Sequence, residues 1–423
     1  MKILVMFRSA RVALTLLCAG AALTAHAGPL ELDDAEVLAL LEDPSVRAVE
    51  AQSEALSEQA VAARQLPDPA LKLGMVALPT DTFDLGQEAM TQLQVGVMQK
   101  FPRGRTRELR AEQFLQRSDG LDAAALDRRA QVTLAVRHEF LEVLTQLKLA
   151  EINREAEQAF TDLADITQDY YASGRVQQQD VLRASVELGR VQDRGQRIAQ
   201  AEEQARARLA AWIGDAAARE LPGQWPELPP PRPSEQIIAG LGTHPRIEAL
   251  QQDITAAETG VELARQAYRP EFSLDLTYGD RRGTPPGAVS TRPDLFSVML
   301  VMDLPLFTGQ RQDRMVAARA AETSSAQYKR DTELRRLRSE VQSQAAQWRR
   351  EQERLSFYES LLLPEASFNA DSSFEAYQSA VGNLTTLMRA RITEFELQLE
   401  YVRLQADALK SQARLLYLQG ETS

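Results

Sequence analysis

The residue types that carry most enzyme and metal chemistry are scarce in this sequence. Its 423 residues include one cysteine, Cys18, and three histidines, of which His138 and His244 lie outside the N-terminal segment. No Gly-x-Ser-x-Gly, Walker loop or His-Glu-x-x-His motif is present, so no catalytic residue is predicted. The two histidines occupy separate segments of the chain, and we predict neither a metal site nor a cofactor. The sequence therefore favours a protein that is not an enzyme.

The composition narrows the class of protein further. Lys and Arg number 48 against 60 Asp and Glu, which gives a net charge of −12 and argues against binding to nucleic acid. Aromatic residues contribute only 6%, and the apolar content rests largely on Ala and Leu. This mixture is typical of long helices rather than of an aromatic-rich globule.

The first residues predict export from the cytoplasm. Residues 1–11 carry three basic side chains and no acid, residues 12–23 are apolar, and Ala25-His26-Ala27 is a small-x-small cleavage pattern. We therefore expect a secretory signal peptide over residues 1–27, with Cys18 inside the removed segment. Its removal would change the net charge from −12 to −15 and leave a chain without cysteine.

The remaining chain contains related segments in the same order twice. Asp43-Pro44 is echoed by His244-Pro245, and Tyr171-Ala172-Ser173-Gly174 by Tyr377-Gln378-Ser379-Ala380. The near-constant offset predicts an internal duplication, with repeats at residues 28–220 and 234–423 and a Pro-rich connector at 221–233.

Each predicted repeat contains the same series of helices. An amphipathic helix is followed by two short strands, a very long helix and a returning helix. The expected helical ranges are 33–65, 105–171 and 177–213 in the first repeat, and 234–267, 310–376 and 384–418 in the second. A helix of about 65 residues is about 100 Å long, so an amphipathic and a returning helix must stack end to end to cover it. We expect a long cylinder of helices with an irregular belt at mid-height.

The strand segments alternate between apolar and polar residues. One predicted face is apolar and suited to lipid: Leu93, Val95, Val97, Phe272, Leu274, Leu276 and Tyr278. The other is polar and suited to a lumen: Lys72, Gln92, Gln94, Ser273, Asp275 and Thr277. Four strands cannot close a barrel, whereas three copies would supply twelve. A small soluble sheet packed on the helices is the alternative interpretation.

The turns around Tyr171-Ala172-Ser173-Gly174 and Tyr377-Gln378-Ser379-Ala380 are the most specific motifs, because each ends one helix and begins the next. Together with Phe101-Pro102-Arg103-Gly104 and Pro305-Leu306-Phe307-Thr308-Gly309, they make the mature chain resemble the TolC family of outer membrane efflux proteins. The motif Leu66-Pro67-Asp68-Pro69 and the segment 95–102 are most similar to the heavy-metal branch of that family.

The resemblance implies a mainly helical fold with a small β part: a long helical barrel on a transmembrane β-barrel of twelve strands in a homotrimer. It implies an efflux duct in the outer membrane of a Gram-negative bacterium, contacting outer membrane lipid, with a large periplasmic extension. A periplasmic membrane-fusion adaptor and an inner-membrane pump are the implied partners, and heavy-metal cations the implied substrate. By resemblance, the tips that dock the adaptor and close the duct are Gly174, Arg175, Val176, Gln177, Asp180, Ala380, Val381, Gly382, Asn383 and Thr386.

Two departures from the family pattern affect these tips. Ala380 occupies the position where the family usually has glycine, with Gly382 two residues later. Asp180 matches an acidic position near the family's constriction, whereas its counterpart Thr386 is uncharged. The alternatives are an exported periplasmic coiled-coil structural or adaptor protein without a pore and, within the family, a duct for drug efflux or type I secretion.

Overall fold

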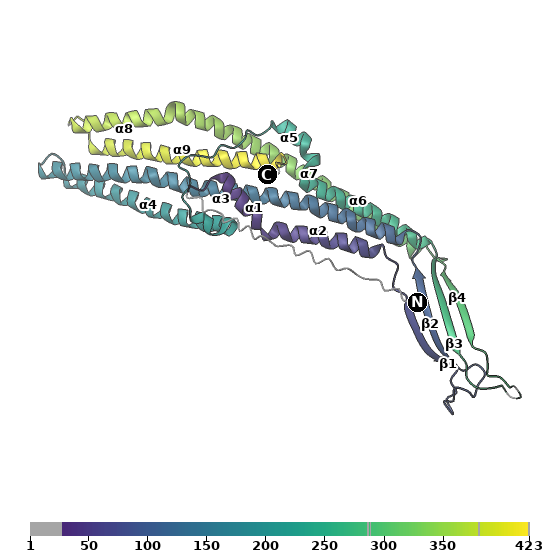
Figure 1. Ribbon diagram of the computed structural model, residues 1–423. Coiled ribbons are helices and arrows are strands. Elements are labelled where there is room, and N and C mark those ends of the chain that lie inside the picture. Colours follow the sequence, from purple (N-terminus) through teal and green to yellow (C-terminus); the bar gives the residue numbers. More distant parts are fainter. Residues whose placement is uncertain (1–27, 286, 288, 380, 422–423) are drawn as a thin grey trace, which may run out of the picture.

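The protein is an elongated layer of long helices with a small sheet at one end (Figure 1). The computed structural model describes residues 28–285, 287, 289–379 and 381–421. The predicted signal peptide at 1–27 and the predicted tip residue Ala380 lie outside the described residues.

The first half of the chain begins with a broken helix, because Asp43-Pro44 ends one helix and starts another. The Asp43 Oδ1 accepts hydrogen bonds from the backbone N–H groups of Ser45 and Val46, each at 2.9 Å, and Pro44 occupies the first turn. The elements of this half are α1 (Leu32–Glu42), α2 (Pro44–Ala63), β1 (Ala70–Val76), β2 (Gln92–Phe101), α3 (Thr106–Ala172), α4 (Gln178–Ile213) and η1 (Gly214–Ala218).

The second half repeats this order of elements. Its segments are α5 (Ser234–Gly240), η2 (Leu241–Thr243), α6 (Pro245–Arg265), η3 (Gln266–Tyr268), β3 (Glu271–Asp280), β4 (Leu295–Asp303), α7 (Gln312–Phe357), the π-helical turn η4 (Tyr358–Leu362), α8 (Leu363–Gln378) and α9 (Leu384–Leu418). The returning helices α4 and α9 begin 206 residues apart, the offset seen in the sequence.

Helix α3 is the central element of the layer. It packs against α2 and α6 toward the sheet and against α4 and α9 toward the opposite end (Figure 1). Each half of α3 therefore packs against two shorter helices, because no one of them is long enough to cover its full length. Phe140 and Leu141 on α3 are fully buried, and the core cluster around Phe140 joins α3 to α1 and α4.

The second long helix, expected at 310–376 with Pro364 as an internal breaker, is interrupted just before that proline. Its α-helical pattern ends at Phe357, passes through the π-helical turn η4 and resumes in α8, where Pro364 lies in the first turn. Proline has no N–H to donate and clashes with the carbonyl four residues earlier, and a π-turn relieves both problems.

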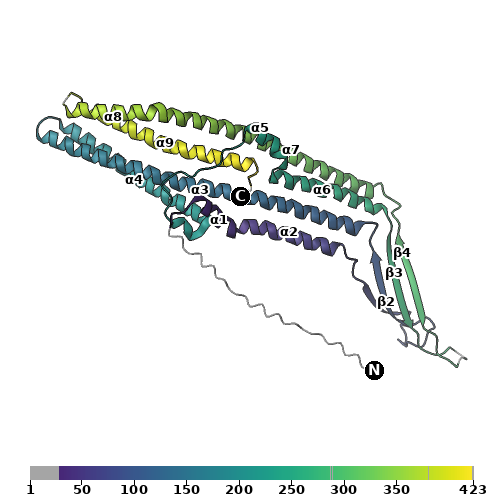
Figure 2. The ribbon, with the colours of Figure 1, turned by 45° about the horizontal axis from the view of Figure 1, so that its top comes forward.

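The four strands form one antiparallel sheet in the order β1-β2-β3-β4. The central pair joins β2 to β3, which belong to different halves of the chain. The sheet continues from the ends of α2, α3, α6 and α7 (Figure 2).

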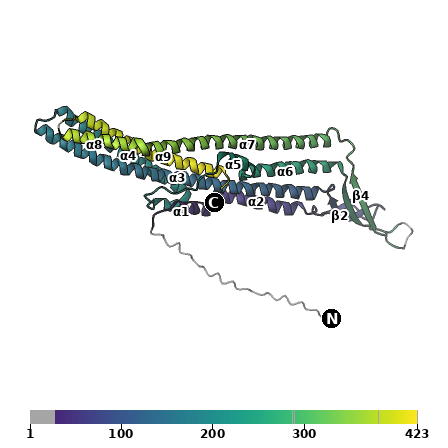
Figure 3. The ribbon, with the colours of Figure 1, turned by 90° about the horizontal axis from the view of Figure 1, so that it is seen from above.

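An irregular belt crosses the helices at mid-height, built from α1, α5 and the connector after η1 (Figure 3). The connector is attached to α9, because Trp225 Nε1 donates to Gln405 Oε1 at 2.9 Å and Gln412 Nε2 donates to the carbonyl of Leu228 at 2.9 Å. Within the described ranges, none of the helices combines the length and apolar character needed to span a membrane.

Candidate functional site

The first tip is the turn between α3 and α4. Gly174 adopts φ 71°, a left-handed conformation in which side chains are strained, and its N–H donates to the Tyr171 carbonyl at 2.9 Å. The N–H of Arg175 donates to the Tyr170 carbonyl at 2.8 Å, which completes a Schellman turn. The Asp180 carboxylate accepts a hydrogen bond from the backbone N–H of Gln177 at 3.2 Å, so this acid caps the start of α4.

The second tip, between α8 and α9, closes in a similar way without a left-handed glycine among its described residues. The N–H of Val381 donates to the Ala376 carbonyl at 3.0 Å, which matches the Arg175 bond of the first tip. Gly382 also donates to Ala376, at 2.8 Å. Asn383 caps α9, because its Oδ1 accepts from the Thr386 N–H at 3.0 Å and from the Thr386 hydroxyl at 3.1 Å.

The two tips contact each other at the end of the layer opposite the sheet (Figure 2). The rings of Tyr170 and Tyr377 lie 5.7 Å apart, and the Arg175 guanidinium lies 5.3 Å from the Tyr170 ring. Arg183 on α4 donates a hydrogen bond to the Thr385 hydroxyl on α9. The two turns therefore contact each other through side chains that lie beside the predicted tip residues.

One face of the sheet is apolar in most of its rows. In register, Leu73, Val95, Tyr278 and Phe296 form one row across all four strands, and the next apolar row is Leu71, Val97, Leu276 and Val298. These side chains are exposed, with Leu73 at 73% and Phe296 at 68%. All seven residues of the predicted apolar set lie on this face.

The opposite face carries all six residues of the predicted polar set. Lys72 on β1 forms an ion pair across β2 with Asp275 on β3, whose other oxygen accepts from the Thr277 hydroxyl at 2.8 Å. Gly96 lies between them, and a Cβ there would come within 2.6 Å of the Thr277 hydroxyl. The absent side chain leaves room for Lys72 to reach Asp275.

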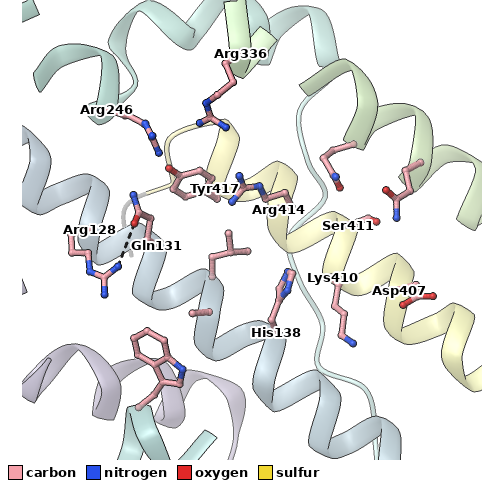
Figure 4. Close-up of a pocket in the computed structure, with 15 residues that line it drawn as sticks. Arg128, Gln131, His138, Arg246, Arg336, Asp407, Lys410, Ser411, Arg414 and Tyr417 are labelled. Atoms are coloured by element: carbon pink, nitrogen blue, oxygen red, sulfur yellow. Dashed lines mark hydrogen bonds between the residues drawn. The ribbon is translucent and has the colours of Figure 1, made fainter. Parts of the chain in front are cut away.

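A polar cavity of about 700 Å³ lies at mid-height between α3, α7 and α9 (Figure 4). Arg246 pairs with Glu333 at 2.5 Å, while Arg336 pairs with Glu333 at 2.8 Å. Lys410 pairs with Glu142, also at 2.5 Å. The cavity is thus bordered by an ion-pair network that joins four helices.

Burial shapes the protonation of groups near this cavity. Burial lowers the pKa of His138, assisted by the positive charges of Lys410 and Arg414, so the imidazole is held neutral. Burial raises the pKa of Asp407. Burial, followed by the charge of Asp127 and the hydrogen bond to it, raises the pKa of Tyr417 to about 12. In the part of the chain that the structure describes, no group of three or more His, Cys, Asp or Glu side chains is arranged to hold a metal ion.

The sequence interpretation missed the basic residues that line the cavities of α3. Arg107 and Arg110 line a cavity beside the sheet, Arg117 lines a second cavity, and Arg128 lines the one at mid-height. Their spacing was a detectable signal, since Arg110 and Arg117 are seven residues apart and Arg107 and Arg128 are three heptads apart.

The fold defines the class of protein. The predicted mainly helical chain with a small β part is confirmed, and the same fold occurs in solved outer membrane channels. The outer membrane protein VceC from Vibrio cholerae is 18% identical with a TM-score of 0.77, covering 92% of this chain and 96% of its own. A membrane protein from Pseudomonas aeruginosa is 18% identical with a TM-score of 0.80, covering 92% of this chain and 90% of its own. CusC is 13% identical with a TM-score of 0.75, covering 92% of each chain.

Residues 240–421 match the model of the outer membrane efflux protein family. The family match thus lies within the second half of the chain, whereas the fold shared with the solved structures covers 92% of it. The family description and these titles name outer membrane proteins and a channel, and no enzyme, in agreement with the sequence-based expectation. No curated protein sequence matches this chain.

Proposed function

We propose that this protein is an outer membrane duct that passively conducts solutes out of the cell. The observation that carries the proposal is the sheet, whose exposed apolar face and polar opposite face suit a wall between lipid and water. Strands β2, β3 and β4 have 10, 10 and 9 residues, enough for tilted strands to cross a bilayer.

The two edges of the sheet, β1 and β4, support assembly of several copies. Four strands with two edges cannot enclose a pore, whereas a homotrimer would pool twelve strands and pair every edge. In this proposal the apolar set led by Leu93 and Leu274 faces outer membrane lipid, and the polar set that includes Lys72 and Asp275 faces the lumen. The helical layer then extends into the periplasm.

The tips at the far end of the helices are the proposed docking surface for a periplasmic membrane-fusion adaptor, which in turn contacts an inner-membrane pump. The contacts between the two turns, Tyr170 with Tyr377 and Arg183 with Thr385, support this role. Asp180 accepts the capping hydrogen bond from Gln177. This contact favours a role for Asp180 in stabilising the turn rather than in forming a ring of free acidic side chains. We also propose that a signal peptide is removed from the chain and that the remainder consists of two structural repeats, at 28–220 and 234–423.

Membrane fractionation tests the duct against a periplasmic coiled-coil protein without a pore. We expect a heat-resistant trimer in outer membrane extracts, whereas a soluble monomer or dimer in the periplasm would contradict the duct. The Leu274→Lys variant should impair membrane assembly, because it places a charge on the proposed lipid face. The Thr277→Lys variant, on the polar face, is the matched control and should assemble.

A bulky replacement tests the docking surface separately. The Gly174→Val variant should abolish export while the trimer still assembles, and wild-type export would contradict the placement of the docking surface.

Heavy-metal cations remain the substrate predicted from the sequence resemblance, and CusC supports that prediction only as a fold. Drug efflux and type I secretion stay open as alternatives within the family.

A further inference from the structure

Basic side chains outnumber acidic ones in three of the cavities on the described helices. Three cavities, of about 700, 260 and 450 Å³, are lined together by eleven Lys and Arg side chains and four acids. The acids are Asp253, Glu271, Glu322 and Asp407. This balance is the reverse of the whole chain, in which 60 acids exceed 48 bases. The positive charge is therefore concentrated in these cavities.

The basic residues of α3 that line the cavities lie on one side of the helix. Arg110 and Arg117 belong to a seven-residue series that continues through Gln131 and His138, both of which line the mid-height cavity. In a helix that packs with a supercoil, positions seven residues apart keep the same face. The acids at the start of α3 line none of the three cavities: Glu108, Glu112, Asp119 and Asp122.

This side of the helices continues into the polar face of the sheet. Arg103 lines the cavity beside the sheet and forms ion pairs with Glu271, at 3.5 Å, and with Asp303. Glu271 and Asp303 are partners in the register of β3 and β4, in the same alternating set as Asp275. The cavity beside the sheet therefore shares a side with the polar face.

Part of this positive charge is not neutralised within the chain: six of the eleven basic side chains form ion pairs, and among the described residues the other five form none. Among the described residues, Arg107, Arg110 and Arg117 form no ion pair, and the Arg107 guanidinium donates to the carbonyl of Arg64 at 2.9 Å. Arg128 donates to the Ser45 hydroxyl at 2.6 Å. Burial raises the pKa of Asp253, and the nearby positive charges of Arg117 and Lys329 oppose this shift.

We propose that the lumen of this duct is cationic near the membrane and that its cargo is anionic, a solute carrying carboxylate, phosphate or sulfonate groups. The inference rests on the proposed duct, because only in a duct does the polar side become a lumen. Guanidinium groups bind such oxyanions with paired hydrogen bonds, and a passage lined by one sign of charge concentrates the opposite ion. Free metal cations would meet a repulsive wall.

Ion selectivity in planar lipid bilayers tests the inference. The full-length purified protein is reconstituted under a KCl gradient, and the sign of the reversal potential reports the preferred ion even at low conductance. We expect chloride preference in the wild type, falling at least about threefold in R107Q/R110Q/R117Q. The matched control E108Q/E112Q/D119N removes three charges from other positions of the same helix and should keep the wild-type ratio.

The outcomes separate the inference from the proposed function. Preference for potassium in the wild type, or an equal change in the acid and arginine variants, would overturn the anionic lumen. Absence of conductance together with absence of an outer membrane trimer would count against the duct itself.

A binding measurement that needs no open tip decides the inference when conductance is low. Fluorescence anisotropy should detect the trisulfonated dye pyranine on the detergent-purified trimer. Binding should weaken about fivefold or more in the arginine variant and stay unchanged in the acid variant. Equal binding to all three proteins would overturn the proposal.

Discussion

The two long helices of this protein follow the same order of elements but have different surroundings. Helix α3 runs unbroken for 67 residues with neighbours along both halves of its length, and Phe140 on it is fully buried. Helix α7 ends after 46 residues at a π-helical turn and leaves large side chains such as Tyr328 70% exposed. One series of elements thus supplies both a packed spine and a helix with an open face. We expect another copy in the proposed homotrimer to cover this face of α7.

The test with the largest expected effect removes one side chain from each of the two long helices. Phe140→Ala should cost about 3–5 kcal/mol in the free energy of unfolding, because it leaves a cavity in the core around α3. Urea denaturation of the detergent-solubilised protein, followed by circular dichroism, measures the loss.

Tyr328→Ala on α7 is the matched variant. Within a single chain it should cost less than about 0.5 kcal/mol, since the side chain is exposed. If Tyr328→Ala weakens the trimer while leaving the fold intact, another copy covers this face. A cost for Tyr328→Ala equal to that of Phe140→Ala would contradict the distinction between spine and open face.

The second test uses the acid that joins α6 to α7. Hydrogen bonds from Arg336 hold the pKa of Glu333 below its ordinary value, with burial opposing, and Arg246 also pairs with this carboxylate. A carboxylate with a lowered pKa stabilises the fold above about pH 4.5 and loses that contribution as the pH falls through the folded-state value.

Glu333→Gln should therefore cost about 1 kcal/mol at pH 7 and little at pH 3. Urea denaturation of both proteins between pH 3 and pH 7 measures this difference. A constant gap between the two stability curves over that range would show that the ionised pair contributes nothing.

The third test distinguishes the two tips. Gly174→Ala should cost about 1–2 kcal/mol locally, because its φ of 71° is unfavourable for any side chain. Gly382→Ala should cost less, since its backbone is not left-handed; its cost arises instead from the new Cβ, which would lie 3.1 Å from the backbone carbon of Ala376.

Hydrogen exchange of the tip amides measures both variants, with the slow amides around Phe140 as internal reference. Equal acceleration of exchange in the two variants would show that the tips are held in the same way, despite their different glycine conformations.

The sequence predicted those parts of the molecule that follow from local periodicity. The alternation of the strands placed Leu93 and Leu274 on one face and Lys72 and Asp275 on the other, because side chains on a strand alternate between faces. The turn chemistry around Gly174 and Asn383 located the helix ends within about a residue. Helix lengths likewise required two shorter helices along each long one.

Tertiary structure decided what depends on contacts between distant segments. The pairing of β2 with β3 joins residues more than 170 positions apart, and no local pattern specifies that register. The arginines of α3 were visible in the sequence, but the sequence did not show which side of the helical layer they face. The packing of α2 and α6 on the two flanks of α3 fixes that side, and the contact of Arg103 with the sheet identifies it as the polar one.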